Sequence, residues 1–355
     1  MYRTLGVEDG VGMKTKRIVL IVPAALCLVL QTVQAFAQNV KVLVPHTSWN
    51  CGMAEGIPNP ESGVLIFEAE MKLERVANIG KTPYGDRQVA VIQDGTLSGS
   101  KLSGSVMPGA LDLELTLSNG TIEIEQYFVL RTSDGKYVFV HAAGTGAGAN
   151  DVRVVMDFEA PNAGPFAWLN SGKYVARRVL NASAKTMTMR IYDVSGVMTA
   201  TDAASMVRIN KPSGVPSQPW DYRKADPAEK QGPVLITETV TLSPSQSVGV
   251  SKRGNRNIIP ITGGELSGRI PGKVLFGGAD YQNLSSPPAI DARYLWQADN
   301  GDIIIVRNTG SGALVPAFEV RTDSPYAFLN TGKFLSSPPG MKPGGVGITM
   351  YESTR

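Results

Sequence analysis

Apolar and polar residues alternate along most of the chain, in short runs that are separated by glycine, asparagine and aspartate. Alternation with a period of two is typical of β-strands that bury one face, and the separating residues are typical of turns. In the C-terminal half the strand candidates are roughly 234–242, 247–252, 257–262, 265–276, 279–284, 289–298, 302–309, 316–322 and 345–352. Apolar residues at helical spacing occur only near the N-terminus, so the pattern predicts an all-β protein.

The chain carries this pattern twice. The residues from Phe166 to Lys173 and those from Tyr326 to Lys333 are identical at five of eight positions. Other matches keep the same order along the chain: 65–70 with 235–240, 95–99 with 264–268, 132–135 with 298–301, and 191–193 with 350–352. Ordered matches over about 120 residues indicate a tandem duplication of one domain rather than a short-period solenoid.

Short strands with Gly, Asn and Asp turns indicate an antiparallel sandwich or barrel, and closure into a barrel removes exposed strand edges. Between the copies lie Pro212, Pro216, Pro219 and Pro227, which lack the amide donor that a sheet interior needs. We therefore predict two tandem antiparallel β-barrel domains joined by a proline-rich linker. The predicted boundaries are a signal segment at 1–37, an irregular leader at 38–63, a diverged first barrel at 64–210, a linker at 211–232 and a second barrel at 233–355.

The N-terminal segment has the features of a secretory signal peptide. A basic stretch, Met13–Arg17, precedes an apolar run, Ile18–Leu30, that is too short to span a bilayer comfortably. The tripeptide Ala35–Ala37 supplies small residues at the two positions that signal peptidase requires. We expect a bacterial Sec-type signal cleaved before Gln38, a secreted or periplasmic mature chain, and residues 1–12 as an extension before the natural start. No other segment is long and apolar enough to cross a membrane.

Removal of the signal segment changes the net charge of the chain. The segment carries four basic and two acidic residues, so 30 of the 34 basic and 29 of the 31 acidic residues remain, which gives a net charge of +1. A nearly neutral chain without a basic run lacks the electrostatic footprint for nucleic acid, and this class of partner is excluded. Cys51 is then the remaining cysteine, so no intrachain disulfide is expected.

The titratable residues exclude several kinds of active site. The mature chain has two histidines, His46 and His141, which lie far apart in the sequence. A charge-relay hydrolase requires a histidine that a carboxylate orients, and a zinc site requires three or four clustered ligands. A strand pattern follows the glycine-rich stretch from Gly144 to Ala149, whereas a phosphate-binding loop precedes a helix. We therefore expect no metal and no cofactor.

The second copy resembles a known family. Its segments GGELSG, GGADYQ, DARYLW, DNGDIIIVRN and YAFLNTGKF occur in this order between residues 263 and 334 and are similar to the bacterial domain-of-unknown-function family 3237. The first copy resembles this family only as a diverged repeat. The resemblance implies a closed β-barrel about the size of one copy, and it assigns no activity because the family has none assigned.

The candidate ligand-binding residues of the second copy are Asp280, Gln282, Asp291, Arg293, Asn308 and Tyr326. Residues two apart share one face of a strand, so Asp280 lies beside Gln282 and Asp291 beside Arg293. If these faces point into the barrel, an arginine and one or two carboxylates meet in an apolar cavity, which is the usual form of a small-molecule site. The alternative is an Arg–Asp pair that closes the barrel mouth or faces solvent.

Three functions remain open from these residues. The first is an exported binding protein for a small molecule that is aromatic or carries a carbonyl or carboxyl group, held by Arg293 and the amide side chains. The second is a cofactor-free enzyme, such as an isomerase, lyase or cyclase, in which Asp280 or Asp291 carries a proton. The third is a structural envelope protein whose barrels only make contacts. Because Tyr127 of the first copy aligns with Arg293, we expect the second copy to keep the site.

Overall fold

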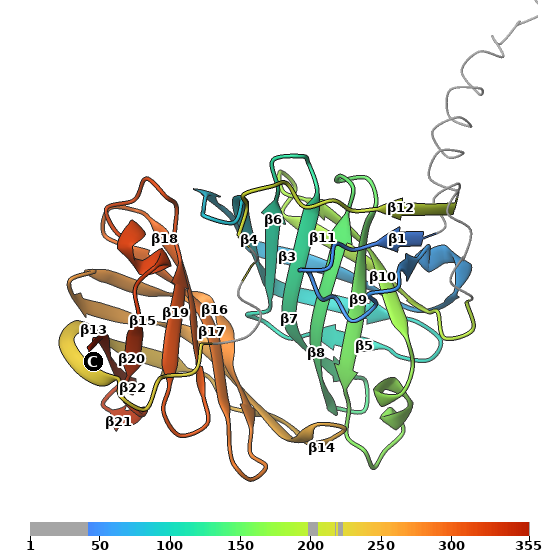
Figure 1. Ribbon diagram of the computed structural model, residues 1–355. Helices are drawn as coiled ribbons and strands as arrows, with labels where there is room; N and C mark the ends of the chain where they lie inside the picture. The colour runs from blue at the N-terminus through green and yellow to red at the C-terminus, as the bar shows by residue number, and fades with distance from the viewer. Residues whose placement is uncertain (1–41, 198–204, 217, 219–222, 355) are drawn as a thin grey trace, which may run out of the picture. The chain divides into compact units, whose positions relative to one another are not determined.

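The computed structural model describes residues 42–197, 205–216, 218 and 223–354 (Figure 1). The predicted signal segment and its cleavage site lie outside the described residues. The described ranges contain strands and short 3-10 helices without an α-helix, which confirms the all-β prediction. None of their helices is long and apolar enough to cross a membrane. The 3-10 helices are η1 (Pro60–Ser62), η2 (Ala167–Asn170) and η4 (Ala327–Asn330).

The first copy folds into a closed antiparallel barrel. Its strands are β3 (Val64–Lys81), β4 (Asp86–Ser98), β5 (Gly104–Val106), β6 (Leu111–Thr116), β7 (Ile122–Thr132), β8 (Tyr137–Gly146), β9 (Val152–Glu159), β10 (Tyr174–Asn181) and β11 (Thr186–Asp193). The hydrogen-bonded order is β3-β11-β10-β9-β8-β7-β5-β4, and β4 pairs back onto β3. Strand β6 pairs with both β4 and β7. Strand β5 also pairs with both β4 and β7, so these two short strands together close the ring between β4 and β7.

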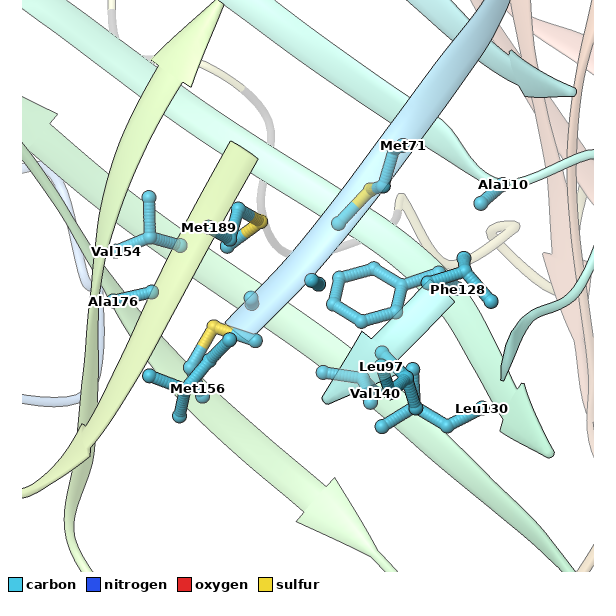
Figure 2. Close-up of a cluster of buried hydrophobic side chains, with 14 of the residues drawn as sticks. Met71, Leu97, Ala110, Phe128, Leu130, Val140, Val154, Met156, Ala176 and Met189 are labelled. Carbon is cyan, nitrogen blue, oxygen red and sulfur yellow. The ribbon is translucent and has the colours of Figure 1, made fainter. Parts of the chain in front are cut away.

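Apolar side chains fill the interior of the first barrel. Figure 2 shows Met71, Phe128, Met156 and Met189 pointing toward one another from four different strands. All four are at most 4% exposed. Interior positions alternate along each strand, as the pleat of a strand requires. The first barrel is thus packed as a core over most of its length.

The second copy forms a curved antiparallel sheet that is an incomplete barrel. Its strands are β13 (Lys230–Leu242), β14 (Gln246–Ser251), β15 (Gly254–Gly268), β16 (Gly272–Asn283), β17 (Ile290–Ala298), β18 (Ile303–Gly310), β19 (Val315–Glu319), β20 (Phe334–Ser336), β21 (Gly340–Lys342) and β22 (Gly345–Thr354). The order is β19-β18-β17-β16-β15-β13-β22-β20, with β14 on β15 and β21 on β22. A single bridge, Leu314 to Ser336, joins the two ends. Pro316, Pro338 and Pro339 near this seam lack the donors that a closing ladder needs.

The leader is more regular than the sequence pattern indicates. Two short strands within 38–63, β1 (Val42–Val44) and β2 (Ile57–Pro58), form a small sheet with β12 (Met206–Arg208). Trp49 and Cys51 of the same segment are buried against the outside of the first barrel. These contacts join residues that are far apart in the sequence, such as Trp49 with Gly144 and Val42 with Met206, and a local pattern does not reveal them.

The strand ladders correct one of the repeat alignments. Ala69 lies opposite Leu97 in the first copy, and Glu238 lies opposite Leu266 in the second. Because the match of 95–99 with 264–268 makes Leu97 equivalent to Leu266, Ala69 is equivalent to Glu238. The alignment of 65–70 with 235–240 is therefore wrong by one residue, and a slip of one residue exchanges the two faces of a strand.

The two copies contact each other through reciprocal ion pairs. Arg87 of the first copy donates from Nε and Nη2 to Glu319 of the second, at 2.8 and 3.0 Å. Arg256 of the second copy donates from the same two atoms to Glu159 of the first, at 2.8 and 2.9 Å. The ladders make Arg87 equivalent to Arg256 and Glu159 equivalent to Glu319. The interface is thus isologous, like that of a two-fold symmetric dimer.

Candidate functional site

Three neighbouring strands of the second barrel bring a carboxylate and an amide onto one face. Asp280 of β16 lies opposite Ala292 of β17, and Ala292 lies opposite Asn308 of β18. Directly opposed residues of antiparallel strands point to the same side of the sheet. Ala292 belongs to the core inside the barrel, so Asp280 and Asn308 also face inward. The two polar residues therefore flank one small side chain.

Asp280 is only partly satisfied by the protein. Its Oδ2 accepts a hydrogen bond from Gln282 Nε2 at 2.8 Å, and Gln282 Oε1 accepts one from Asn257 at 2.9 Å. Its Oδ1 is buried and has no hydrogen-bond partner among the described residues. Burial raises the pKa of Asp280 to about 6, although the Gln282 side chain and the Asp291 backbone oppose this shift. Gln282, a predicted site residue, thus orients the carboxylate.

Asn308 is buried in the same way, with 1% of its surface exposed. Its Nδ2 donates to Ser336 Oγ at 3.1 Å, which fixes the orientation of the amide. Its Oδ1 has no hydrogen-bond partner in the described part of the chain. The half-buried Ile290 is the next inward residue of β17 beyond Ala292 and packs against the core. The site therefore combines two acceptor oxygens with an apolar rim.

Tyr326 is in a different part of the same barrel. It immediately precedes η4 and packs half-buried against the core, together with Phe328 of that helix. Its backbone amide donates to Ser324 Oγ at 3.0 Å. The structure therefore assigns Tyr326 to the packing of the core, and gives it no described contact with Asp280 or Asn308.

The first barrel satisfies the equivalent carboxylate completely. Asp112 is equivalent to Asp280 in the ladders, and Arg178 donates to its two oxygens from Nε at 2.9 Å and from Nη2 at 2.6 Å. Arg178 also donates from Nη1 to Glu114 at 2.7 Å. The Gln126 amide, which occupies the position of Ala292, donates to Asp112 as well. The Arg178 guanidinium and the Gln126 amide thus surround the carboxylate of the first barrel, whereas the second barrel has Ala292 at the position of Gln126.

Asp291 and Arg293 lie on the outward face of β17, and the structure does not bring them together with Asp280 and Asn308. Arg293 donates from Nε to Asp291 Oδ1 at 3.0 Å and from Nη1 to Glu125 Oε1 of the first copy at 2.8 Å. Strand alternation explains this, because the even-numbered residues of β17 fill the core. Burial and the nearby Glu125 and Asp280 carboxylates raise the pKa of Asp291. The expected guanidinium clamp for a ligand therefore joins the two barrels instead.

The charges around Glu125 and Glu319 form a buried network between the copies. Arg307 lies between the two carboxylates, with N–O distances of 3.8 Å to Glu125 and 3.6 Å to Glu319. Burial alone would raise the pKa of Glu125, but Arg293, His141 and Arg307 lower it well below its usual range. Glu319 has a lowered pKa for the same kind of reason, since Arg87 and Arg307 outweigh its burial.

One carboxyl group inside the second barrel, that of Glu238, is not among the residues predicted from the sequence. Glu238 is 1% exposed and accepts hydrogen bonds from Tyr294 Oη at 2.5 Å and Trp296 Nε1 at 2.9 Å. Burial raises its pKa to about 7, although the two hydrogen bonds oppose the shift. Alternation could have located it, because Glu238 lies two residues from both Ile236 and Val240, which are core residues. The one-residue error in the repeat alignment concealed this.

Histidine and cysteine side chains do not assemble into a metal centre in the described residues, where no group of three or more His, Cys, Asp or Glu is positioned for a metal. His46 pairs with Glu123. His141 lies within β8 and stacks on Tyr127, with 4.6 Å between ring centroids. Burial raises the pKa of the Cys51 thiol to about 12, so this thiol is unreactive near neutral pH.

The chain is similar to proteins without an assigned activity. A family model described as protein of unknown function (DUF3237) matches residues 62–195 and 233–317, and the match extends farther in the first copy. A UPF0311 protein of Bradyrhizobium diazoefficiens is 38% identical over 78 residues, which are 21% of this chain and 51% of that protein. A UPF0311 protein of Clostridium acetobutylicum is 27% identical over 104 residues, or 28% of this chain and 61% of that protein.

The match to these curated relatives covers only about half to three fifths of their length. Among solved structures, a β-barrel-like protein from Acinetobacter baumannii is 20% identical to this chain, with a TM-score of 0.34. That comparison covers 37% of this chain and 94% of the other.

Proposed function

The chain belongs to the DUF3237 family of proteins of unknown function, and from this premise we propose that it binds a small organic molecule inside the second barrel, with Asp280 and Asn308 as the hydrogen-bonding groups. We also propose that it acts after export, because its N-terminal segment has the features of a signal peptide. The binding site retains Asp280, Gln282 and Asn308 from the residues that the sequence singles out.

The observation that carries the proposal is a pair of buried oxygen atoms. Asp280 Oδ1 and Asn308 Oδ1 share the inward face of the barrel and lack a hydrogen-bond partner among the described residues. Burying an unsatisfied polar atom costs about 1–3 kcal/mol, so native proteins pair such atoms with another group, a ligand or an ordered water. Two of them on either side of an alanine favour a ligand that donates hydrogen bonds to both.

The first barrel supports the same conclusion. It has the same fold, yet Gln126 and Arg178 occupy the interior next to Asp112. It also has Ala142 at the position of Asn308. In the first copy the protein itself satisfies the carboxylate, and Gln126 Oε1 is the acceptor there without a partner among the described residues. In the second copy the carboxylate keeps an unpartnered oxygen of its own, and the Asn308 amide adds another.

The experiment is a thermal-shift screen of the purified chain against polar small molecules, followed by calorimetry on any compound that raises the melting temperature. Asn308→Ala introduces the residue of the first copy, so the barrel should still fold. We expect it to weaken binding about tenfold, the loss of one hydrogen bond to a buried acceptor. Glu265→Gln, an exposed change on β15, is the control and should bind normally. Equal affinity of the two variants would contradict the proposed site.

A second candidate function is a cofactor-free enzyme that moves a proton. The observation that favours it is the presence of two inward-facing carboxyl groups with raised pKa values, about 6 for Asp280 and about 7 for Glu238. Such groups exchange protons efficiently near neutral pH. If a bound compound is also converted, Asp280→Asn should abolish turnover while binding persists. A ligand that binds without any turnover would leave binding as the function.

A further inference from the structure

We propose that the ligand of the second barrel carries a cationic nitrogen group, a guanidinium or an amine, which pairs with Asp280 and donates to Asn308. This inference rests on the binding function proposed above and adds the chemical class of the ligand. It comes from the duplication itself, because the first barrel fills the same place with a guanidinium of its own.

The second barrel has lost both groups that satisfy the carboxylate in the first. Ala292 stands where the first copy has Gln126, which removes the amide. Phe334 is equivalent to Tyr174 in the ladders, so by count Pro338 stands where the first copy has Arg178. Strand β20 ends at Ser336 and Pro338 is exposed, so the wall of the barrel is short here.

The charge balance favours one positive charge at this place. The first barrel holds two carboxylates, Asp112 and Glu114, around the Arg178 guanidinium. In the second barrel Gln282 replaces Glu114, so Asp280 is the one carboxylate left at these two equivalent positions. No described basic side chain forms an ion pair with Asp280. A buried carboxylate without a counter-ion is costly, and either a proton or a cation relieves the cost.

Asn308 sets the second requirement on the ligand. Its amide nitrogen is engaged by Ser336, so its oxygen is an unpartnered acceptor on the inward-facing row that also contains Ala292 and Asp280. A ligand with at least two N–H groups can donate to both residues at once. A guanidinium has five such donors in a planar fork and an ammonium has three, and both carry the charge that Asp280 requires. The half-buried Ile290 provides an apolar contact for the rest of the molecule.

The probes are butylguanidinium and butylammonium, with butylurea as the neutral compound of similar shape. Calorimetry on the purified chain at pH 7.5 should show binding of the two cations and at least about tenfold weaker binding of butylurea, the usual effect of a charged hydrogen bond. Because Asp280 must be ionised to pair with a cation, the affinity for both cations should fall below pH 6.

Two variants test the position of the cation. Ala292→Gln introduces the residue of the first barrel, whose amide reaches the carboxylate there, and it should weaken cation binding at least about tenfold. Asp280→Asn keeps the size of the side chain and removes its charge, so it should have the same effect if the larger glutamine disturbs the fold. Glu265→Gln is the control and should leave cation binding unchanged.

The outcomes separate this inference from the function on which it rests. Cation binding that disappears in Asp280→Asn supports the inference. If butylurea or another neutral compound binds as tightly as the cations, and Asn308→Ala weakens it, the ligand class is wrong and the binding function stands. If no cation and no compound of the wider screen responds to Asp280→Asn or Asn308→Ala, both the ligand class and the binding function are wrong.

Discussion

Arg293 lies over the ring of Tyr127, with 4.3 Å between its guanidinium carbon and the ring centroid, although the two residues occupy equivalent positions in the two copies. Equivalent residues of a two-fold pair touch each other only near the axis that relates them. The contact therefore marks the centre of the interface. In a symmetric pair of second copies, two arginines would face each other here and repel. Tyr127 replaces that repulsion with a cation–π attraction.

Arg293→Lys should weaken the interface between the copies and leave the ligand site intact. Lysine lacks the planar fork that contacts Glu125, Asp291 and Tyr127 together. We expect a loss of about 1–2 kcal/mol in the free energy of unfolding, measured by urea titration. Arg269→Lys is the control. Arg269 forms an exposed pair, and such pairs contribute about 0–1 kcal/mol. A weaker ligand affinity with unchanged stability would contradict the interface role.

Arg87→Met should be more damaging, because it leaves the Glu319 carboxylate buried at 0% exposure without its main counter-ion. Breaking a buried pair from one side typically costs about 3–5 kcal/mol. The double variant Arg87→Met with Glu319→Leu should recover more than half of this loss, since no charge is then left unpaired. Urea unfolding of the single and double variants measures both. A double variant that is less stable than the single one would show that the charges themselves hold the copies together.

Gly278→Ala should destabilise the chain more than Gly301→Ala, although both glycines have a positive φ, +83° and +91°. A Cβ on Gly278 would lie 1.9 Å from the carbonyl oxygen of Arg293, whereas one on Gly301 would have no atom within 4 Å. We expect about 1–2 kcal/mol for Gly301→Ala from the left-handed backbone alone, and a larger loss for Gly278→Ala. Thermal unfolding of the two variants measures the difference. Equal losses would mean that the β17 backbone moves away without cost.

Glu238 should make the protein less stable as the pH rises from about 4.5 to 7. An acid whose pKa is raised in the folded state holds its proton more tightly there than in the unfolded chain. Its contribution is therefore fully present below the unfolded pKa and is lost as the pH passes the folded value of about 7. The total change is about 3 kcal/mol. The slope of unfolding free energy against pH should be smaller in Glu238→Gln. The same slope in both proteins would contradict the raised pKa.

N-terminal sequencing of the protein expressed in a bacterial host should find Gln38 as the first residue, with the protein in the periplasmic or secreted fraction. The reason is the order of basic, apolar and small residues before that position. Replacing Ala37 with a bulky residue should block the cleavage. Retention of the apolar run in the purified chain, or its recovery with the membranes, would contradict the expected processing.

The fold could be predicted from the sequence because it depends on two patterns that short segments carry, the alternation within each strand and the repeated motifs. Alternation marks the strands, and matched motifs such as those around Asn170 and Asn330 reveal the duplication. In each copy this asparagine bonds the backbone ten residues before it, at Ala160 and at Val320. Alternation also shows correctly that Asp280 and Gln282 share a face.

The sequence could not show which face is inside, and the cause is the interface between the copies. Contact with the other barrel buries the outward face too, so Leu295 and Tyr281 are as buried on the outside as Trp296 is on the inside. Both faces of β17 then carry the residue types of a core. Arg293 is consequently easy to mistake for a pocket residue, and Glu238 for a surface one.

The tether between the copies has a consequence for the incomplete second barrel. Two separate barrels with this isologous interface would dissociate on dilution, because the association of two molecules depends on protein concentration. Joined in one chain, they meet at an effective concentration that the connection sets, typically millimolar for a short linker, however little protein is present. Glu319, the last residue of β19 on the incompletely closed side of the second barrel, therefore always has Arg87 of the first barrel as its partner. The two barrels therefore stay in contact although their interiors differ, with Gln126 and Arg178 in the first where the second has Ala292 and Pro338.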